Sequence, residues 1–378
     1  MIYINGKFLA QSLTGVQRFA RQTLAAVDEL LASGEWRTPS PLVLLVPRGR
    51  ATDMPRYRCI QIRELPAGQL HVWEQFRLPF ASRGAPLLNL SGSAPLFKVR
   101  QICTFHDTAV FDVPGAYSGL FVAWYRLLFQ VQGRVSRRLL TVSRFSRERL
   151  MHHLGLPADR IGVVPGAADH MRQLGDEPEV LERLGVAPGR YFLAVGSAMP
   201  TKNFGRLAEA FAGLPDADVR LVVVGGANPA VFADTTDSVQ DDRRIVRAGR
   251  LSDEALKTLY SQARAYVFPS TYEGFGLPPV EAMQCGTPVI AARAAAIPEV
   301  CADAAGYFDP LSLDDIRASL HRAWHDDAWL DTLRAAGSRQ AESFTWRNSA
   351  LALLAELGRL GLAEAREDNA PSLAAVPR

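Results

Sequence analysis

The sequence Glu273-Gly-Phe-Gly-Leu-Pro-Pro-Val-Glu281 follows the apolar run Ala265–Pro269, precedes Cys285-Gly286 and is the strongest indication of the fold. The run is typical of a short buried strand, because it is rich in aromatic and β-branched residues and closes on proline. Pro278 and Pro279 suit the first turn of a helix, and Cys285-Gly286 suits its end. The glycines therefore lie in a strand-to-helix loop, where backbone N–H groups can bind phosphate. Since carboxylates flank the loop and can bind hydroxyls, the stretch predicts a site for a nucleotide sugar.

Length and composition point to a two-domain globular protein. The chain has 378 residues, 48% hydrophobic and 21% charged, which is too long for one ordinary core and too apolar for disorder. No run reaches the ~18 apolar residues of a membrane span, and no signal-peptide pattern opens the chain. The four cysteines have no Cys-x-x-Cys spacing, so neither a zinc site nor a disulfide framework is indicated. We therefore expect a cytoplasmic protein.

Strand-like and helix-like segments alternate along both halves, which predicts an α/β fold with parallel sheets covered on both faces. We expect a first Rossmann-like domain over residues 1–172 and a second over 186–345, with the polar segment Gln173–Arg190 as the linker. The tail 364–378 has the composition of a disordered segment. The expected strands are Ile2–Ile4, Leu42–Val46, Cys59–Arg63, Leu87–Leu90, Ile102–Phe105, Leu139–Val142, Ile161–Val164, Tyr191–Val195, Leu221–Val224, Ile245–Val246, Tyr266–Phe268 and Val289–Ala291.

Much of the sequence from Phe268 to Ile290 resembles the retaining glycosyltransferases of family 4, whose signature is two glutamates separated by seven residues around a Gly-Phe-Gly turn. The resemblance covers roughly residues 1–360 in order. It implies the GT-B fold, in which two Rossmann-like doubly wound domains face each other across a cleft. It also implies that a final helix, expected over residues 346–362, crosses back to the first, acceptor-side domain.

The resemblance assigns the donor site to the second domain. Glu281 is expected to bind the ribose and Glu273 to contact the sugar ring near the reaction centre. Lys202, in Val195-Gly-Ser-Ala-Met-Pro-Thr-Lys-Asn203, corresponds to the family's diphosphate-binding lysine, where a cation can stabilise the leaving group. The arginine that many relatives add near this lysine is replaced by Ser197 and Thr201. Further donor-binding residues expected from the family pattern are Gly274, Phe275, Gly276, Leu277, Ser197, Arg250 and Leu251.

The first domain contributes two more matches to the family. Gly15, in a loop before the first helix, would let the backbone approach the donor or the acceptor. His106, in Thr104-Phe-His-Asp107, would hydrogen-bond a hydroxyl of the donor sugar and counts with Lys202 and Glu273 as a catalytic candidate. Asp107 is expected to orient the loop. We do not expect His106 to be a general base, because family members are thought to pass the acceptor proton to the leaving diphosphate.

Charge is unevenly distributed along the chain. Residues 1–170 contain 21 Lys and Arg against 11 Asp and Glu, whereas the whole chain has a net charge of only +3. In this half, the apolar segment Gly119–Phe129 leads into Arg134, Arg137 and Arg138, a composition typical of interfacial helices. We therefore expect reversible docking on anionic lipid at the cytoplasmic face of the inner membrane. The alternative is that these aromatic residues only pack the core.

The sequence thus predicts a retaining hexosyltransferase that adds one sugar to a growing, lipid-linked glycan in polysaccharide or lipopolysaccharide synthesis. The Gly-Ser-x-x-Pro-x-Lys-Asn-Phe pattern favours mannose from GDP-mannose. No obligatory metal or other cofactor is expected, because the pair Asp241-Asp242 lies away from the strand ends. No nucleic-acid-binding motif accompanies the basic half. Two alternatives remain, a nucleotide-sugar epimerase of the same fold and a non-catalytic scaffold that binds sugar nucleotides. An NAD-dependent oxidoreductase is disfavoured because no Gly-x-Gly-x-x-Gly follows an early strand.

Overall fold

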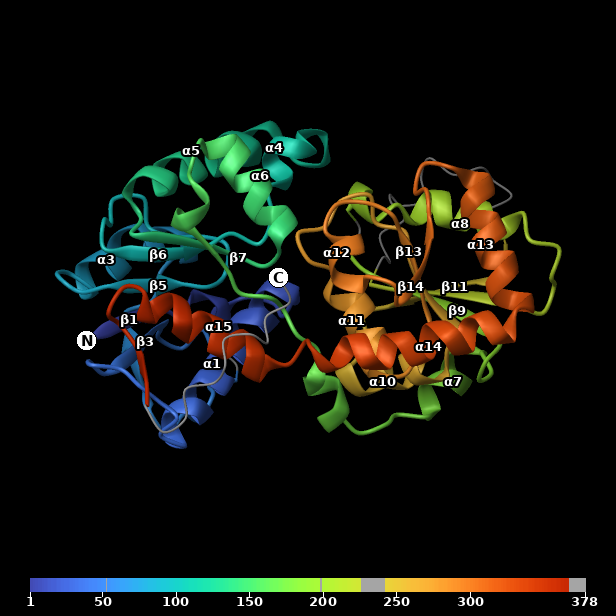
Figure 1. Ribbon diagram of the computed structural model, residues 1–378, viewed down its shortest axis with the longest axis horizontal. Coiled ribbons are helices and arrows are strands. Elements are labelled where there is room, and N and C mark those ends of the chain that lie inside the picture. Colours follow the sequence, from blue (N-terminus) through green and yellow to red (C-terminus); the bar gives the residue numbers. More distant parts are fainter. Residues whose placement is uncertain (52, 198, 226–241, 367–378) are drawn as a thin grey trace. The chain divides into compact units, whose positions relative to one another are not determined.

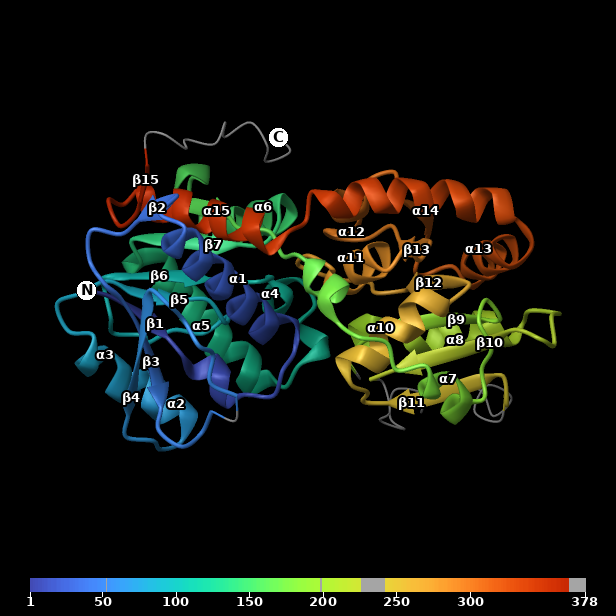
Figure 2. The ribbon, with the colours of Figure 1, turned by 90° about the horizontal axis from the view of Figure 1, so that it is seen from below.

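The computed structural model describes residues 1–51, 53–197, 199–225 and 242–366 (Figure 1). The chain divides into two compact units. Unit 1 comprises residues 1–166 together with the segment from Trp346 onward, and unit 2 comprises residues 167–345. Each unit is a parallel sheet with helices on both faces (Figures 1 and 2), so the expected doubly wound α/β architecture is confirmed.

Unit 1 contains a seven-stranded sheet in the order β4-β3-β1-β5-β6-β7-β8, in which all neighbours are parallel. Its strands are short and, apart from the partly exposed edge strand β4, largely buried, as expected for a parallel sheet covered on both faces. They are β1 (Ile2–Asn5), β3 (Leu42–Pro47), β4 (Ile60–Leu65), β5 (Leu87–Asn89), β6 (Gln101–Thr104), β7 (Arg138–Thr141) and β8 (Ile161–Val163).

Helices α1 (Gly15–Ala32) and α15 (Trp346–Gly358) pack against each other in unit 1. The rings of Phe19 and Trp346 meet edge to face with centroids 6.4 Å apart. An ion pair between Arg347 and Glu35, 2.5 Å long, joins the start of α15 to the segment after α1. The last helix therefore belongs to the unit formed by the first half of the chain. The remaining unit 1 helices are α2 (Leu70–Val72), α3 (Leu78–Ala81), α4 (Ala109–Asp112), α5 (Gly119–Val135) and α6 (Arg144–Leu154).

Unit 2 contains a six-stranded parallel sheet in the order β11-β10-β9-β12-β13-β14. Its strands are β9 (Tyr191–Val195), β10 (Arg220–Val224), β11 (Ile245–Gly249), β12 (Ala265–Phe268), β13 (Val289–Ala292) and β14 (Ala305–Phe308). Its described helices are α7 (Glu179–Leu184), α8 (Phe204–Ala212), α10 (Asp253–Gln262), α11 (Leu277–Gln284), α12 (Ile297–Cys301), α13 (Leu313–His325) and α14 (Asp327–Glu342).

The segment expected to link the two domains packs into unit 2 instead. The change of unit falls between Gly166 and Ala167. Beyond it, Lys257 Nζ donates to Leu174 O at 2.7 Å, and Thr258 Oγ1 accepts from Glu177 N at 2.8 Å, which fastens the segment to α10. Its polar composition reflects an exposed position on unit 2, not a linker.

The expected disorder of the tail is wrong at its start. Strand β15 (Glu364–Ala365) pairs antiparallel with β2 (Trp36–Arg37), and Arg37 forms an ion pair with Glu364 at 2.8 Å. This short ribbon attaches the end of the chain to unit 1 because the backbone finds hydrogen-bond partners there. The rest of the predicted tail, 367–378, lies outside the described residues.

Candidate functional site

The centre of the unit 2 sheet has the geometry of a ligand site. Strand β9 pairs with β10 on one side and with β12 on the other, so the order of strands reverses between β9 and β12. Open α/β sheets bind ligands at such a switch point, beyond the carboxyl ends of the strands. The loop that follows β9 carries Lys202, and the loop that follows β12 carries Glu273.

Lys202 and Glu273 meet above this switch point. The Nζ atom of Lys202 lies 2.5 Å from Oε1 of Glu273, and both side chains are largely buried. The Lys202 ammonium also lies 5.9 Å from the centroid of the Phe268 ring, within range of a cation–π contact. A cation and a carboxylate that are held together here can bind an anionic leaving group and a hydroxyl, respectively.

Backbone contacts between the two loops set this geometry. Thr201 O accepts hydrogen bonds from Thr271 N at 2.8 Å and from Thr271 Oγ1 at 3.2 Å. Asn203, with a left-handed φ of 56°, donates from Nδ2 to Pro269 O at 3.2 Å. The loop of Lys202 and the loop of Glu273 are thus joined on both sides of the lysine, which holds the two side chains together.

The glycine-rich loop leads directly into α11. Gly276 has φ 102°, a conformation that favours glycine, and it immediately precedes the first helical residue, Leu277. Pro278 lies in the first turn and Cys285 caps the end, as the sequence predicted. The N–H groups of the first turn of a helix are unpaired within the helix and favour an anion at this end.

Glu281 lies on α11 and is buried beside a tyrosine. Tyr260 donates its hydroxyl hydrogen to Glu281 Oε2 at 3.1 Å. Burial and, to a lesser extent, the carboxylate of Glu281 raise the pKa of Tyr260 well above its ordinary value. The phenol therefore stays protonated and acts as a hydrogen-bond donor to the Glu281 carboxylate. Such a carboxylate keeps further lone pairs for ribose hydroxyls.

The other predicted donor residues of unit 2 lie at the same edge of the sheet. Gly274 and Phe275 are buried in the β12–α11 loop, and the Phe275 ring packs edge to face on Phe344 with centroids 5.5 Å apart. This makes the Phe275 side chain a packing residue. Ser197 is exposed after β9, Arg250 is exposed after β11, and Leu251 beside it is half-buried.

Glycines make this edge a surface of bare backbone. Gly225 follows β10 with φ 84°, and a Cβ atom there would come within 2.6 Å of Gly196 O. Gly225 N donates to Gly249 O at 2.7 Å. A Cβ atom at Gly196 would lie 3.1 Å from the Phe204 ring and 3.4 Å from Cδ of Lys202, so the lysine side chain packs directly beside this glycine.

Unit 1 contains a pocket of its own, with a volume of about 270 Å³. It receives His106 from the end of β6 and residues on both sides of Gly15 from the start of α1. Aromatic and hydroxyl or amide side chains dominate its wall. Its lining consists of Lys7, Gln11, Thr14, Val16, Gln17, His71, Ser91, Gly92, Ser93, Phe105, His106, Asp107, Val110, Tyr117, Phe121, Tyr125 and Phe129.

One wall of this pocket is an aromatic ladder, which we define as Tyr117, Phe121 and Tyr125. The rings stack successively, with centroids 5.1 Å and 4.3 Å apart. On the opposite side, the buried Lys7 pairs with buried Glu74 at 2.7 Å and donates to Ser93 Oγ at 3.0 Å. The combination of a ring surface with hydroxyl and amide groups suits a sugar, whose C–H face packs on rings while its hydroxyls take hydrogen bonds.

His106 is held as a neutral acceptor. Its Nε2 atom lies 2.9 Å from Leu90 O, and because a carbonyl only accepts, Nε2 carries the hydrogen. Burial lowers the pKa of His106 to about 4, against the opposing effect of the hydrogen bond to Leu90. Its Nδ1 atom is therefore an acceptor at neutral pH. A nitrogen with so low a pKa is better suited to accept a hydrogen bond from a sugar hydroxyl than to remove its proton as a general base.

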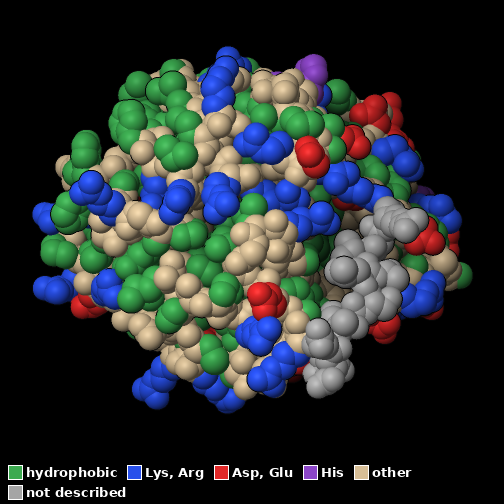
Figure 3. Space-filling model, turned by 60° about the vertical axis from the view of Figure 1, so that its left-hand side comes forward, with side chains coloured by type: hydrophobic (Ala, Val, Ile, Leu, Met, Phe, Trp, Pro, Cys, Tyr) green, Lys and Arg blue, Asp and Glu red, His purple; other side chains and the backbone are tan. Residues whose placement is uncertain are grey.

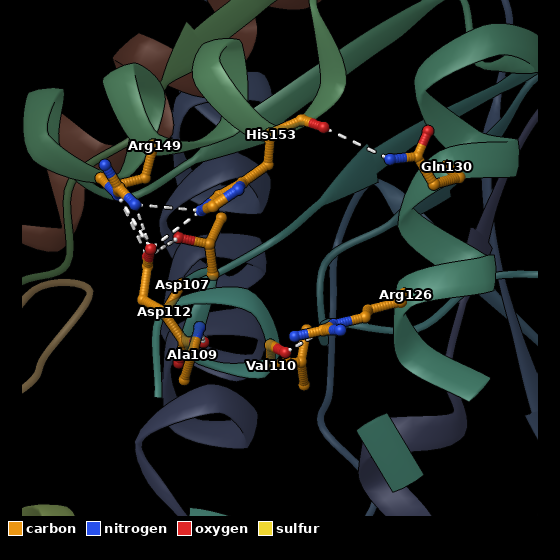
Figure 4. A network of polar contacts seen from close by, with 9 residues as sticks. Asp107, Ala109, Val110, Asp112, Arg126, Gln130, Arg149 and His153 are labelled. Atoms are coloured by element: carbon orange, nitrogen blue, oxygen red, sulfur yellow. Dashed lines mark hydrogen bonds and ion pairs between the residues drawn. The ribbon is translucent and has the colours of Figure 1, made fainter. Parts of the chain in front are cut away.

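A polar network braces the loop that carries His106 (Figure 4). Asp107 Oδ1 accepts from Ala109 N at 2.8 Å, which starts α4 directly after the histidine. Asp112, at the end of α4, accepts from His153 Nε2 at 2.8 Å and forms an ion pair with Arg149, both on α6. Asp107 thus has the orienting role that the sequence analysis expected. No sequence pattern indicated this network, because Asp112 is 37 residues from Arg149 and 41 residues from His153 in the chain.

The structure brings the predicted residues together in two sets. Lys202, Glu273 and Glu281 lie at the switch point of unit 2. His106 lines the pocket of unit 1, whereas Gly15 itself does not, although its neighbours Thr14 and Val16 do. Among the described residues, no group of three or more His, Cys, Asp or Glu lies close enough to hold a metal ion. Asp241 is outside the described residues, and Asp242 forms an ion pair with Arg244 at 2.8 Å.

The segment expected to enter a membrane divides between three environments. On α5, Leu128 and Phe129 lie in the core, Phe121 and Tyr125 line the pocket, and Leu120 is exposed. Arg138, one of the expected basic residues, forms an ion pair with Glu356. In the described part of the chain, no helix combines the length and the apolar composition needed to cross a bilayer.

Comparison with known proteins agrees with this geometry. Residues 181–341 match the family model described as glycosyl transferases group 1, and residues 49–172 match that of glycosyltransferase family 4. O-antigen chain mannosyltransferase B of Escherichia coli is 34% identical over 257 residues, which cover 66% of this chain and 68% of that protein. Serotype-specific mannosyltransferase WbdA of Escherichia coli is 26% identical over 374 residues, or 92% of this chain, which spans only 43% of that longer protein.

The fold has close counterparts among solved structures. Sucrose-phosphate synthase from Thermosynechococcus elongatus superimposes with a TM-score of 0.72 at 20% identity, over 95% of this chain and 99% of that one. Both units are therefore built as in that structure.

Proposed function

This chain belongs to family 4 of the retaining glycosyltransferases, the glycosyl transferases group 1 with the GT-B fold, and on that premise we propose that it transfers mannose from GDP-mannose to a growing glycan. The acceptor is a lipid-linked oligosaccharide of bacterial polysaccharide or lipopolysaccharide synthesis. Support for mannose comes from the two mannosyltransferase relatives. The main structural support for the reaction is the contact of Lys202 with Glu273 above the switch point, where Nζ of the lysine lies 2.5 Å from Oε1 of the glutamate.

The residues of unit 2 divide the donor between them. Glu281 binds the ribose hydroxyls with an orientation fixed by Tyr260. The backbone at the start of α11 binds the diphosphate, and Glu273 binds the hydroxyls of the sugar. As the bond between the sugar and the diphosphate breaks, negative charge grows on the leaving oxygen, and Lys202 stabilises it. No residue of this scheme requires a metal ion, so we propose catalysis without an obligatory metal.

The pocket of unit 1 binds the acceptor sugar. Its aromatic ladder provides a face for the acceptor ring, and His106 Nδ1 accepts a hydrogen bond from a hydroxyl of the donor sugar, the role that the family pattern implies. The buried pair Lys7–Glu74 keeps the opposite wall rigid, because Asn5 Nδ2 also donates to Glu74 Oε1, at 3.0 Å. This unit carries the excess of basic residues, and we propose that it docks on the anionic cytoplasmic face of the inner membrane, where lipid-linked acceptors reside.

Incubation of the purified protein with nucleotide sugars tests the proposal. Transfer of mannose from GDP-mannose to a mannosylated acceptor with an α-linked product, detected by mass spectrometry and NMR, is the expected result. Among GDP-, UDP- and dTDP-sugars, GDP-mannose should raise the Tm most, since a ligand that binds only the folded state stabilises it. Conversion of the donor without an acceptor would indicate an epimerase, and binding without any turnover would indicate a scaffold.

A further inference from the structure

Unit 1 exposes three phenylalanine side chains close to one another in the chain. Phe76, Phe80 and Phe97 are 70%, 80% and 87% exposed. Val72 and Val99 are also more than half exposed. We define these five residues as the phenylalanine face. Isolated exposed apolar side chains are ordinary on a protein surface, but a group of this size indicates a binding surface.

The folding of unit 1 does not account for these side chains. Val72, Phe76 and Phe80 alternate with inward residues along one continuous helical segment, which consists of α2, a π-helical turn over Trp73–Arg77, and α3. Trp73 and Leu78 face inward, where they pack in a core cluster with Val43 and Leu45 of β3. The segment is therefore apolar on its inner side, which the core uses, and again on its outer side, which the core does not use.

Hydrogen bonds join the two parts of the face. Lys98 Nζ donates to Ser82 O at 2.8 Å and to Ala85 O at 2.9 Å. Arg100 donates to Gly84 O at 3.0 Å. The loop that carries Phe97 and Val99 is thus fastened to the turn that follows α3. From this connection we infer that the five apolar side chains belong to one surface.

The exposed charged residues of the segment that carries this surface have one sign. Residues 66–106 contain four Lys and Arg, namely Arg77, Arg83, Lys98 and Arg100. The single acid in this range is Glu74, which is buried and paired with Lys7. Arg77, Arg83 and Arg100 are exposed. On the side of the molecule drawn in Figure 3, hydrophobic and basic side chains intermingle and acidic side chains are few.

We propose that the phenylalanine face inserts into the headgroup boundary of an anionic lipid bilayer, with Arg77, Arg83 and Arg100 bound to lipid phosphates. Exposed aromatic and aliphatic tips with basic side chains between them are the composition of surfaces that lie in a membrane interface. The charge of this segment is complementary to anionic lipid, and its single acid, Glu74, is buried and does not face the lipid.

The face also borders the acceptor pocket. His71 lines the pocket, and the next residue, Val72, belongs to the face. Insertion would bring the pocket mouth to the lipid surface, where the sugar of a lipid-linked glycan emerges. This inference rests on the proposed function for its substrate, and it assigns membrane docking to the segment 72–100 in place of α5.

Vesicle flotation of the full chain tests the assignment. The wild type should bind phosphatidylglycerol-containing vesicles more tightly than pure phosphatidylcholine vesicles, and high salt should weaken binding. The variant Phe76→Ser/Phe80→Ser/Phe97→Ser should bind anionic vesicles at least about tenfold more weakly, because each phenylalanine loses a buried apolar surface. Arg77→Gln/Arg83→Gln should lose most of the preference for anionic lipid.

Two single variants serve as controls. Leu311→Ser, at an exposed apolar position of unit 2, should leave vesicle binding unchanged. Leu120→Ser, on α5, should have little effect on vesicle binding. If this variant loses binding while the triple phenylalanine variant still binds, the proposal is overturned and α5 is the docking element. Because the three phenylalanines are exposed, the triple variant should keep the wild-type circular dichroism spectrum and the rise in Tm that GDP causes.

Two further outcomes are distinguishable. If the wild type forms a dimer by light scattering and the triple variant is a monomer, with neither bound to vesicles, the face is a protein interface and the proposal fails. If the wild type binds vesicles through this face but transfers no mannose, the docking surface stands and the proposed function fails.

Discussion

Nζ of Lys202 and Oε1 of Glu273 lie 2.5 Å apart above the point where the strand order of unit 2 reverses. In the unliganded protein each charge neutralises the other, so neither is left buried alone, which would be costly. A nucleotide sugar brings its own anion to Lys202 and its own hydroxyls to Glu273. In the proposed function, donor binding would therefore exchange one internal ion pair for two contacts with the ligand.

Lys202→Ala should lower kcat by about a hundred- to thousandfold. The lysine acts on charge that grows in the transition state, and such an interaction is typically worth about 2–4 kcal/mol. Steady-state kinetics at saturating donor measures the effect. Lys257→Ala is the matched control, since this lysine also lies in unit 2 in an ion pair, with Asp176 at 3.1 Å, but away from the switch point. Half of normal turnover in Lys202→Ala would mean that another cation stabilises the leaving group.

Glu281→Ala and Glu273→Gln should separate binding from turnover. Glu281→Ala removes the ribose contact, so calorimetry should show weaker binding of both GDP-mannose and GDP. Glu273→Gln should lower kcat and leave the affinity for GDP nearly intact, because GDP lacks the sugar that Glu273 contacts. Equal losses of GDP affinity in both variants would contradict this division. Tyr260→Phe, which removes only the hydrogen bond to Glu281, should weaken GDP binding less than Glu281→Ala does.

Removal of divalent metals should leave the transfer rate within about twofold of its original value, because Lys202 supplies the positive charge that a metal ion supplies elsewhere. Assays with and without EDTA, on protein passed over a chelating resin, measure this. Loss of activity that magnesium or manganese restores would show that the donor diphosphate needs a metal as well as the lysine.

The sequence predicted the elements of the two sheets well where apolar runs were strong. It did not predict β14, whose residues Ala305-Gly-Tyr-Phe308 form only a weak strand pattern. The structure explains the glycine there, because a Cβ atom at Gly306 would come within 2.3 Å of the Trp329 ring. The need for glycine at position 306 is set by Trp329, which is distant in the chain, so the residues around Gly306 do not reveal it.

The loop pattern was enough to single out the residues proposed for the donor site, whereas it gave no indication of the contacts that orient them. Tyr260 reaches Glu281, and Thr271 reaches Thr201, only because neighbouring strands bring their carboxyl ends together. In unit 1 the four-residue spacing of Tyr117, Phe121 and Tyr125 was a usable signal for one helix face. It was interpreted as a membrane surface, since sequence alone does not tell a pocket wall from an exposed face.

Phe121→Ala should weaken acceptor binding specifically. The ring is the middle member of the aromatic ladder, and stacking interactions are worth about 0.5–1.5 kcal/mol, so KM for the acceptor should rise about two- to tenfold. KM for the donor should not change. Leu127→Ala, at an exposed position of the same helix that does not line the pocket, is the control. A rise in donor KM with an unchanged acceptor KM would mean that the pocket does not bind the acceptor.

His106 should make the folded protein less stable in mild acid. Its pKa is about 4 in the folded state and 6.5 for the ordinary side chain, so below pH 6.5 the unfolded chain takes up a proton that the folded protein excludes until about pH 4. The free energy of unfolding therefore falls as the pH drops through this window, by up to about 2 kcal/mol between pH 7 and pH 5. Denaturation of wild type and His106→Gln at both pH values measures this contribution, because glutamine can still donate to Leu90 O but does not titrate.

The same low pKa has a consequence for the kinetics. Since the imidazole stays neutral above about pH 5, its titration should not produce a step near pH 6.5 in the pH profile of kcat, and the profiles of wild type and His106→Gln should have the same shape there. Such a step, or an equal loss of stability in both proteins, would mean that the histidine is more accessible to water than its burial beside Phe19 indicates.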